Sequence, residues 1–351
     1  FWLSILRITR QQVSTPSSIR IFSALRSARL SYICTYPAEA VLHRRALLQT
    51  KTFLMMNQIA VIGSGTMGNG IAHVFALHGY PVHLVDVSPG ALERAVKTIQ
   101  GNLDRQVTKS LITGEEKARA LELLHTSTDL KKAVAMADLI IEAVTENEAV
   151  KLEIFRELDT AAPPGAVLAS NTSSISITRI ASVTKRPEKV IGMHFMNPVP
   201  VMKLVELING YRTDPAVTRD VFELARSLDK TPCIVNDYPG FISNRILMPM
   251  INEAVQALFE GVAGVEEIDT VMTLGMAHPM GPLQLADFIG LDVCLAIMEV
   301  LHEGFASPRY APCPLLRNMV AAGRLGVKTG EGFYRYTQGT KDKTVSDAFQ
   351  K

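Results

Sequence analysis

Cysteine is scarce in this sequence of 351 residues, and the spacing of the few cysteines excludes several kinds of site. The four are Cys34, Cys233, Cys294 and Cys313, and no two of them form a C-x-x-C pair. Structural zinc sites and redox-active disulfides use such closely spaced pairs. The sequence therefore predicts no metal site, and thiols that stay reduced, which favours the cytoplasm.

A strong excess of one charge is also absent, because 36 Lys and Arg residues face 34 Asp and Glu residues, for a net charge of +2. The balance is uneven, since residues 1–51 hold eight basic residues and one acid, Glu39. The rest of the chain is mildly acidic and lacks the clustered basic residues of a nucleic-acid surface. No nucleic-acid partner is expected.

Residues 1–55 are expected to form an unstructured extension that takes no part in the fold. Their Arg- and Ser-rich, nearly acid-free composition is typical of a mitochondrial transit peptide, which would direct the protein to the mitochondrial matrix. The alternative is translated upstream sequence, because Met55 and Met56 directly precede an apolar strand and offer a natural start.

Residues 52–85 contain no Asp, Glu, Lys or Arg, yet no membrane-spanning helix is expected there. Such a helix needs about 20 consecutive apolar residues. Here the stretch is interrupted by five glycines and by Asn57, Asn69, His73, His78 and Pro81. Its pattern predicts a strand, a glycine turn, a helix and a second strand, and no insertion into a membrane.

Short apolar strands alternate with amphipathic helices over residues 56–238. Strands are predicted at 57–63, 81–86, 137–144, 166–171, 189–195 and 203–208. A long polar helix is predicted from Pro89 to Ile112, with a break near Gly114. This alternation predicts a Rossmann-type doubly wound α/β fold, whose mostly parallel sheet is covered on both faces.

After Pro239 and Gly240 the pattern becomes helical almost throughout. Residues 239–336 are therefore predicted to form a separate, all-helical C-terminal domain. Residues 337–351 are polar, and we expect them to form a disordered tail.

The hexapeptide "GSGTMG" is a G-x-G-x-x-G motif made of Gly63, Ser64, Gly65, Thr66, Met67 and Gly68. It follows one predicted strand, opens a helix, and precedes a second strand that ends at Asp86, eighteen residues after Gly68. In this context the glycines let the pyrophosphate of a dinucleotide approach the helix N-terminus. Asp86 would bind the adenosine ribose hydroxyls and repel a 2′-phosphate, and the "VSPG" that follows supplies no Lys or Arg. The motif therefore predicts a site for NAD and disfavours NADP.

Five further motifs follow in order along the chain. They are "SNTSS" (170–174), "HFMNPVPVMKLVE" (194–206), "PGFISNR" (239–245), "HPMGP" (278–282) and "KTGEGFY" (328–334). With these motifs the sequence resembles the L-3-hydroxyacyl-CoA dehydrogenase family over about residues 57–336, in particular its stand-alone short-chain 3-hydroxybutyryl-CoA dehydrogenases. The resemblance implies NAD-dependent oxidation of an (S)-3-hydroxyacyl-CoA to a 3-oxoacyl-CoA in fatty-acid or butyrate metabolism. It also implies a homodimer formed through the helical domain.

In this resemblance His194 is the catalytic base, Glu206 is its carboxylate partner, and Ser173 and Asn244 line the substrate pocket. Alcohol oxidation by NAD sends a hydride to the cofactor and a proton to a base that works near neutral pH, which suits histidine. The imidazolium that forms needs a charge partner in a site closed to water. A proline-braced turn between two strands would bring Glu206 within hydrogen-bond reach of His194. The alternative interpretations are a core histidine, a helix cap at Ser173 and a helix-start residue at Asn244.

The resemblance implies further ligand contacts. Contacts to NAD, besides those of the glycine motif and Asp86, are expected from Glu146, Lys151, Ser173, Asn197 and Lys328. Contacts to coenzyme A are expected from Asn102, Lys109 and Ser173. Position 102 departs from the serine of the family pattern.

Two other functions are consistent with the Rossmann pattern. One is a non-enzymatic NAD(H)-binding protein, and the other is a dehydrogenase of a free hydroxy acid that lacks coenzyme A. The presence of both His194 and Glu206 argues against the first, because a protein that only binds NAD needs neither. The two dehydrogenases differ in whether turnover requires a CoA thioester.

Overall fold

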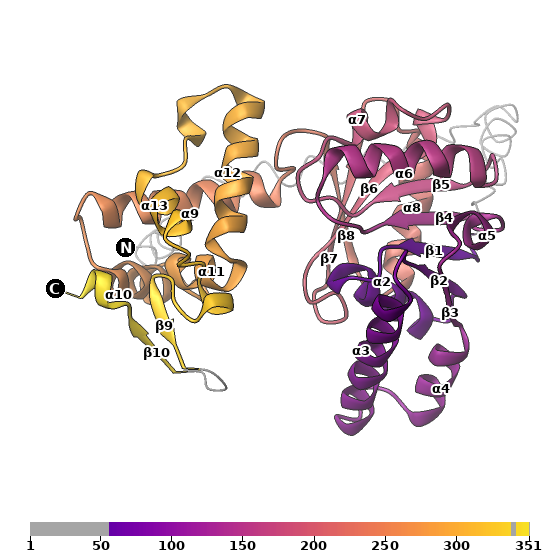
Figure 1. Ribbon diagram of the computed structural model, residues 1–351, viewed down its shortest axis with the longest axis horizontal. Coiled ribbons are helices and arrows are strands. Elements are labelled where there is room, and N and C mark those ends of the chain that lie inside the picture. Colours follow the sequence, from indigo (N-terminus) through magenta and orange to yellow (C-terminus); the bar gives the residue numbers. More distant parts are fainter. Residues whose placement is uncertain (1–55, 338–341, 351) are drawn as a thin grey trace, which may run out of the picture. The chain divides into compact units, whose positions relative to one another are not determined.

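The structure is a computed structural model that describes residues 56–337 and 342–350 (Figure 1). The extension predicted at residues 1–55 lies outside them. A sheet flanked by helices comes first along the chain, and a mainly helical part follows. Among the described helices, none is both long enough and apolar enough to cross a membrane.

Within the described residues, one eight-stranded sheet forms the centre of the first part. Its strands are β1 (Ile59–Ile62), β2 (Val82–Val85), β3 (Leu124–Ser127), β4 (Leu139–Glu142), β5 (Val167–Ser170), β6 (Val190–Phe195), β7 (Leu204–Asn209) and β8 (Thr231–Asn236). Their spatial order is β3-β2-β1-β4-β5-β6-β7-β8. Neighbours run parallel except β6 and β7, which pair antiparallel. The predicted doubly wound, mostly parallel α/β fold is confirmed.

The two edge strands, β3 and β8, were not among the strands predicted from the sequence. Most of their residues are exposed or half-buried, so neither shows the continuous burial of an inner strand, although residues 233–235 of β8 are apolar. Pro232 lies within β8, where it is tolerated because an edge strand can leave one side of its backbone unpaired.

Helices cover both faces of the sheet. Along β1, Ile59 and Val61 belong to one core and Ala60 and Ile62 to the other, because side chains alternate along a strand. The first face is covered by α2 (Thr66–Leu77), α3 (Pro89–Thr108), α4 (Gly114–Glu122) and α8 (Pro215–Ser227). The second is covered by α5 (Leu130–Val134), α6 (Glu148–Ala161) and α7 (Ile177–Ala181). The two cores hold the strands in place, and the loops that carry the polar motifs follow the carboxyl ends of these strands.

The second part has a hydrophobic core of its own, with Leu283, Leu291 and Leu316 fully buried. Its helices are α9 (Ser243–Phe259), α10 (Val265–Thr270), the π-helix η3 (Val271–Gly275), α11 (Pro282–Ile289), α12 (Leu291–Phe305) and α13 (Pro314–Ala321). A core of this kind is what an independent domain requires.

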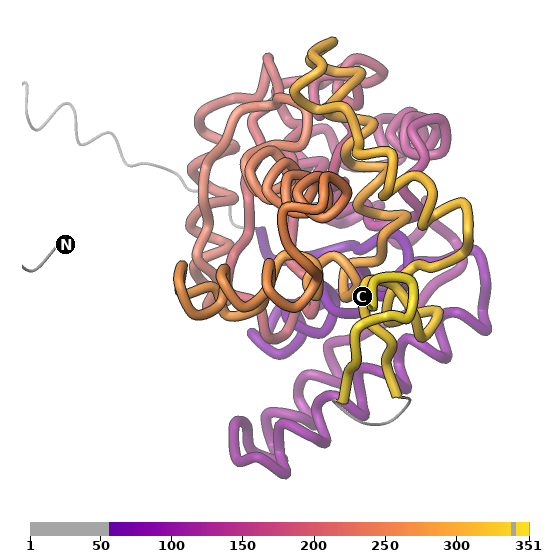
Figure 2. Tube along the Cα trace, turned by 90° about the vertical axis from the view of Figure 1, so that its left-hand side faces the viewer, coloured from indigo at the N-terminus to yellow at the C-terminus, as the bar shows by residue number. Residues whose placement is uncertain are grey.

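The predicted helical C-terminal domain is confirmed, with one short strand at its end, whereas the prediction of a disordered tail is wrong for residues 342–350. β9 (Tyr334–Tyr336) pairs antiparallel with β10 (Lys343–Val345), and Figure 2 shows this hairpin in yellow near the C-terminal end. Beyond it, Phe349 packs against Phe333 with ring centroids 5.8 Å apart. Residues 342–350 are thus part of the fold.

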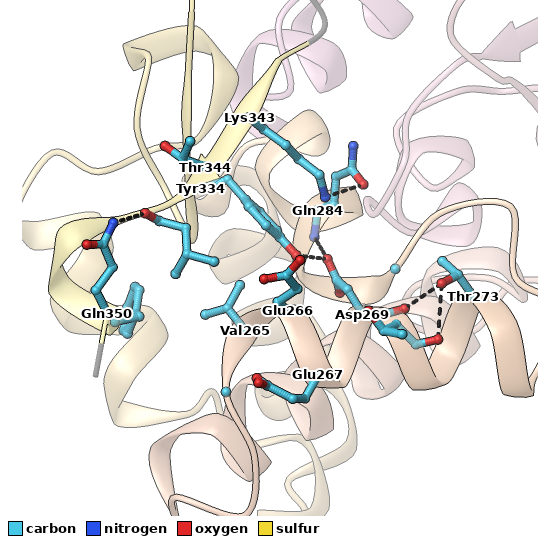
Figure 3. A pocket seen from close by; sticks show the side chains of 15 residues that line it. Val265, Glu266, Glu267, Asp269, Thr273, Gln284, Tyr334, Lys343, Thr344 and Gln350 are labelled. Carbon is cyan, nitrogen blue, oxygen red and sulfur yellow. Dashed lines mark hydrogen bonds between the residues drawn. The ribbon is translucent and has the colours of Figure 1, made fainter.

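Two buried carboxylates hold the segment around β9, against which the polar tail packs. Asp287 of α11 accepts hydrogen bonds from the backbone N–H groups of Phe333 and Tyr334 at 3.0 and 2.9 Å. Asp269 of α10 accepts one from the Tyr334 hydroxyl at 2.8 Å, and Lys343 lies over the Tyr334 ring (Figure 3). These partners come from helices remote in sequence, so the composition of the tail does not reveal them.

Candidate active site

The loop between β1 and α2 carries the G-x-G-x-x-G motif. Gly63 has a φ of +98°, and a Cβ added there would lie 2.7 Å from the carbonyl oxygen of Ala143. A Cβ on Gly68 would lie 1.7 Å from the carbonyl oxygen of Gly63, whereas one on Gly65 would meet nothing within 4 Å. The loop therefore packs tightly against other backbone at Gly63 and Gly68. It is open at Gly65, where a pyrophosphate can approach the N-terminus of α2.

A cavity of about 1030 Å³ adjoins this loop. β1 has β2 on one side and β4 on the other, so the strand order reverses there, and dinucleotides bind at such switch points. Five of the predicted cofactor residues line the cavity, namely Gly63, Gly65, Thr66, Met67 and Asp86. The open glycine loop, the position and the size of this cavity fit NAD.

Asp86, which follows β2, is held by three hydrogen bonds. Its Oδ2 accepts from the N–H (2.9 Å) and the hydroxyl (2.7 Å) of Ser64, and its Oδ1 accepts from the N–H of Ser88 (3.0 Å). Partial burial opposes ionisation, but these bonds and the charge of Arg94 hold the pKa of Asp86 below its usual value. Ser64 thus fixes the Asp86 carboxylate and does not itself line the dinucleotide cavity.

His194 and Glu206 face each other across β6 and β7. They are directly paired in the register of these strands, so their side chains leave the sheet on the same face. His194 Nδ1 lies 2.8 Å from Glu206 Oε2, and both residues are buried. The predicted contact is confirmed. Among the described residues nothing hydrogen-bonds to Nε2 of His194, so this nitrogen is left for a ligand.

The first residue of α9 contacts the same carboxylate. Ser243 donates its hydroxyl to Glu206 Oε2 (2.7 Å) and its N–H to Oε1 (2.9 Å). Burial alone would raise the pKa of Glu206, but the hydrogen bonds from His194 and Ser243 outweigh it and lower this pKa below its usual value. Sequence reasoning missed Ser243, although its place beside Asn244 in "PGFISNR" was a usable signal.

Ser173 and Asn244 are brought together. Asn244, in the first turn of α9, donates its side-chain N–H to the carbonyl oxygen of Ser173 at 3.1 Å. Ser176 caps α7, so the interpretation of Ser173 as a helix cap is wrong. No hydrogen bond joins the Ser173 hydroxyl to another described residue, which leaves it for a ligand.

Lys151 does not line the dinucleotide cavity. Its side chain is 1% exposed, with Nζ 2.6 Å from Glu142 Oε1 and 3.4 Å from Glu146 Oε2. Glu146 in turn accepts a hydrogen bond from the N–H of Ser173 at 2.8 Å. These charges therefore order the loop that carries Ser173. Glu142, which also accepts from the Ser170 hydroxyl at 2.6 Å, escaped prediction, although a carboxylate ending an apolar strand was its signal.

Asn197 and Lys328, which were predicted to contact NAD, do not line the dinucleotide cavity, and the predicted coenzyme A contacts Asn102 and Lys109 lie away from it on α3. Asn102 and Lys109 lie along α3 and at its C-terminal end, and Lys109 is exposed. Asn197 is exposed in the connection between β6 and β7. Lys328 lies in the helical part, where it forms an ion pair with Asp292. The structure thus brings neither Asn197 nor Lys328 to the cavity.

The fold and the site together define a class of protein. A doubly wound sheet, an open glycine loop, an ionised carboxylate after β2 and a buried imidazole–carboxylate pair are the parts of an NAD-dependent dehydrogenase.

Comparison with known proteins identifies the family. The family model described as the NAD-binding domain of 3-hydroxyacyl-CoA dehydrogenase matches residues 58–238, and the model of the C-terminal domain matches residues 240–336. The chain belongs to the 3-hydroxyacyl-CoA dehydrogenase family, and its cofactor is NAD.

Individual relatives cover nearly the same residues. The chain is 54% identical over 285 residues to a probable 3-hydroxybutyryl-CoA dehydrogenase of Bacillus subtilis. The aligned residues cover 81% of this chain and 99% of that relative. It is 55% identical over 282 residues to a 3-hydroxybutyryl-CoA dehydrogenase of Bradyrhizobium diazoefficiens, with coverages of 80% and 96%. The crystal structure of (S)-3-hydroxybutyryl-CoA dehydrogenase from Ralstonia eutropha matches with a TM-score of 0.79 and 49% identity, over 81% of this chain and 100% of that one.

Proposed function

We propose that this chain oxidises short-chain (S)-3-hydroxyacyl-CoA thioesters, with 3-hydroxybutyryl-CoA as the expected substrate, to 3-oxoacyl-CoA and NADH. The observation that carries the proposal is the buried pairing of His194 with Glu206 at 2.8 Å. His194 stands near the carboxyl end of β6, which is parallel to β4 and β5, so it lies at the sheet edge where the NAD cavity opens. The names of the relatives support the short acyl chain, and with it a role in fatty-acid or butyrate metabolism.

The proposed chemistry divides between NAD and the imidazole. NAD, when bound, accepts the hydride from C3 of the substrate. Nε2 of His194 takes the proton of the 3-hydroxyl, while Nδ1 stays bonded to Glu206. The lowered pKa of Glu206 keeps this carboxylate ionised, so it can stabilise the imidazolium as it forms. In the reverse direction the imidazolium returns the proton to the 3-oxygen.

The Ser173 hydroxyl and the Asn244 amide are assigned to the substrate's oxygen atoms. Coenzyme A is assigned to α3, where Asn102, Arg105 and Lys109 are spaced three and four residues apart and share one face. Cations at the end of that face suit its phosphates. Replacing Lys109 with Ala should raise the KM for acetoacetyl-CoA at low salt, and an unchanged KM would remove Lys109 from the site.

A homodimer formed through the helical part belongs to the same proposal. Large apolar side chains are exposed around η3, among them Val271, Leu274 and Met276, and Leu274 is 83% exposed. Exposed apolar groups of this kind mark protein interfaces. Light scattering should give the mass of a dimer, and Leu274→Glu should shift it to that of a monomer. A cytoplasmic location remains a prediction, and the free thiols of Cys233, Cys294 and Cys313 accord with it.

Oxidation of NADH in the presence of acetoacetyl-CoA tests the proposed activity directly. We expect turnover with the thioester and none with free acetoacetate, because the free acid lacks the coenzyme A part that α3 binds. His194→Gln should retain NADH binding and lose turnover by about hundredfold or more. His125→Gln, at an exposed histidine of β3, is the matched control and should behave as wild type. A wild-type protein inactive with every 3-oxoacyl-CoA from short to long chain would refute the proposal.

A further inference from the structure

A smaller hollow of about 250 Å³ adjoins Asp86. It shares Gly65, Thr66 and Asp86 with the NAD cavity. Its other lining residues come from the glycine loop, α2 and α3, and they are Ser64, Asn69, Ala91, Arg94, Ala95 and Thr98. The hollow therefore extends the cofactor site toward α3, on the side where Asp86 is expected to meet the adenosine ribose.

Arg94 supplies a positive charge to this hollow. A Cβ added at Gly90 would lie 3.5 Å from Nη1 of Arg94, so the guanidinium folds back along the first turn of α3 toward Asp86. Its charge contributes to the lowered pKa of Asp86. Among the described residues the guanidinium forms no ion pair, and its donors stay available. The residues directly after Asp86, "VSPG", supply no cation, but Arg94 supplies one a helical turn later.

The two charges act on a ribose phosphate in opposite directions. The Asp86 carboxylate accepts hydrogen bonds from ribose hydroxyls and repels a phosphate dianion, whereas a guanidinium fork matches phosphate oxygens. We propose that the hollow is a latent subsite for the phosphomonoester of an adenosine ribose, in the first place the 2′-phosphate of NADP, which the charge of Asp86 keeps closed. The choice of NAD over NADP is then a balance between two residues, in the same cofactor site on which the proposed function rests.

Neutralising Asp86 without changing its shape isolates this balance. Asp86→Asn retains an oxygen that can accept both bonds from Ser64 and removes the charge, and Asp86→Ser is a second neutral variant in case the first does not fold. Each is combined with Arg94→Gln. Lys97→Gln, at an exposed lysine of α3 that does not line the hollow, is the matched control for lost positive charge. Fluorescence titration with NADH and NADPH gives Kd values that do not depend on turnover.

We expect Asp86→Asn to bind NADPH about tenfold more tightly than wild type, and Arg94→Gln to cancel that gain while leaving the NADH affinity unchanged. Lys97→Gln should keep the gain. In the wild-type background, Arg94→Gln should weaken the residual NADPH binding alone. A gain that survives Arg94→Gln, or a loss shared equally by NADH and NADPH, would overturn the subsite.

The 3′-phosphate of coenzyme A offers the same chemical group, and a separate measurement distinguishes it. If Arg94→Gln raises the KM for acetoacetyl-CoA and leaves that for its dephospho form unchanged, the hollow serves coenzyme A and the assignment to NADP fails. Failure of the proposed function would look different. Wild-type protein would then bind NADH but show no turnover with acetoacetyl-CoA, whatever the result at Arg94.

Discussion

Glu206 takes hydrogen bonds from two directions on a single carboxylate. Its Oε2 is shared by the His194 imidazole and the Ser243 hydroxyl, and its Oε1 accepts backbone N–H groups at the start of α9. The geometry of the imidazole and the charge of its partner are therefore set by residues on three different elements. Substitutions at these residues separate geometry from charge.

Replacing Glu206 with Gln removes the charge and keeps the shape of the side chain. We expect kcat for acetoacetyl-CoA reduction to fall by about hundredfold to ten-thousandfold, the range lost with an acid–base group, because the imidazolium loses its stabilising partner. NADH affinity should not change. Steady-state kinetics and NADH titration measure the two effects, and Glu223→Gln, at an exposed glutamate of α8, is the control.

Glu206 also contributes to the pH dependence of stability. Its pKa is lowered from 4.5 in the folded protein, so the ionised form stabilises the fold above that pH. This contribution is lost as the pH falls below 4.5 and through the lowered pKa. We expect the Tm to drop with acidification over this window, and to drop less in Glu206→Gln. Melting curves at a series of pH values check this, and parallel curves for the two proteins would contradict it.

Ser243→Ala removes one hydrogen-bond donor from the Glu206 carboxylate and leaves the pairing of His194 with Glu206 in place. The pKa of Glu206 should rise, because a hydrogen bond that favours its ionised form is gone. We expect kcat to fall by about tenfold and the acidic limb of its pH profile to move to higher pH. Ser243→Thr keeps the hydroxyl and should restore both. A loss of kcat without a shift of the pH profile would indicate a purely structural role.

Among the elements, the antiparallel pair of β6 and β7 brings His194 and Glu206 together. The connection between these two strands is held by a residue that lies outside them. Lys230, buried between α8 and β8, donates to the carbonyl oxygens of Val199 and Met202 at 2.5 and 2.8 Å. Burial lowers the pKa of Lys230 to about 8. The hydrogen bonds that this lysine donates fix the connection between β6 and β7, and the pairing of His194 with Glu206 depends on that connection.

Lys230→Met should therefore loosen the turn. Two carbonyl groups lose their donor, so we expect the free energy of unfolding to fall by about 1–3 kcal/mol and kcat to fall with it. Urea unfolding and acetoacetyl-CoA kinetics measure the two effects. Lys203→Met, at an exposed lysine before β7, is the matched control. Equal stability of the two variants would show that the buried ammonium does not hold the turn.

The elements that the sequence could predict are those with local signals. The glycine motif and the inner strands carry apolar runs, and His194 and Glu206 are only 12 residues apart on consecutive strands, so their contact follows from one hairpin. The contacts of Lys230 and Ser243 do not follow from this hairpin, because each residue approaches the site from a later element, and only Ser243 has a sequence signal, its place in "PGFISNR". β3 and the C-terminal hairpin lack apolar runs, and the apolar stretch of β8 directly follows Pro232, so these strands are defined by their neighbours.

In the molecule as a whole, the last segment is structural. β10 pairs with β9, and Phe349 packs against Phe333, which is fully buried. Ending the chain at Thr337 removes both contacts, together with the contact of Lys343 with the Tyr334 ring. We expect a lower Tm and an unchanged NADH affinity, because the cofactor cavity lies in the sheet-containing part. Differential scanning fluorimetry and NADH titration check this, and an unchanged Tm would show that the segment adds no stability.

The start of α9 has an evolutionary consequence. Its N-cap residue, Ile242, offers no side-chain cap, and the N–H groups of Ile242 and Ser243 are capped instead by Glu206 from β7. One carboxylate thus serves the proposed chemistry and the folding of a helix. A substitution at position 206 is selected against on both grounds, even where activity is dispensable. Relatives that drift toward other substrates are therefore expected to change the loops around Ser173 and α3 and to retain this glutamate.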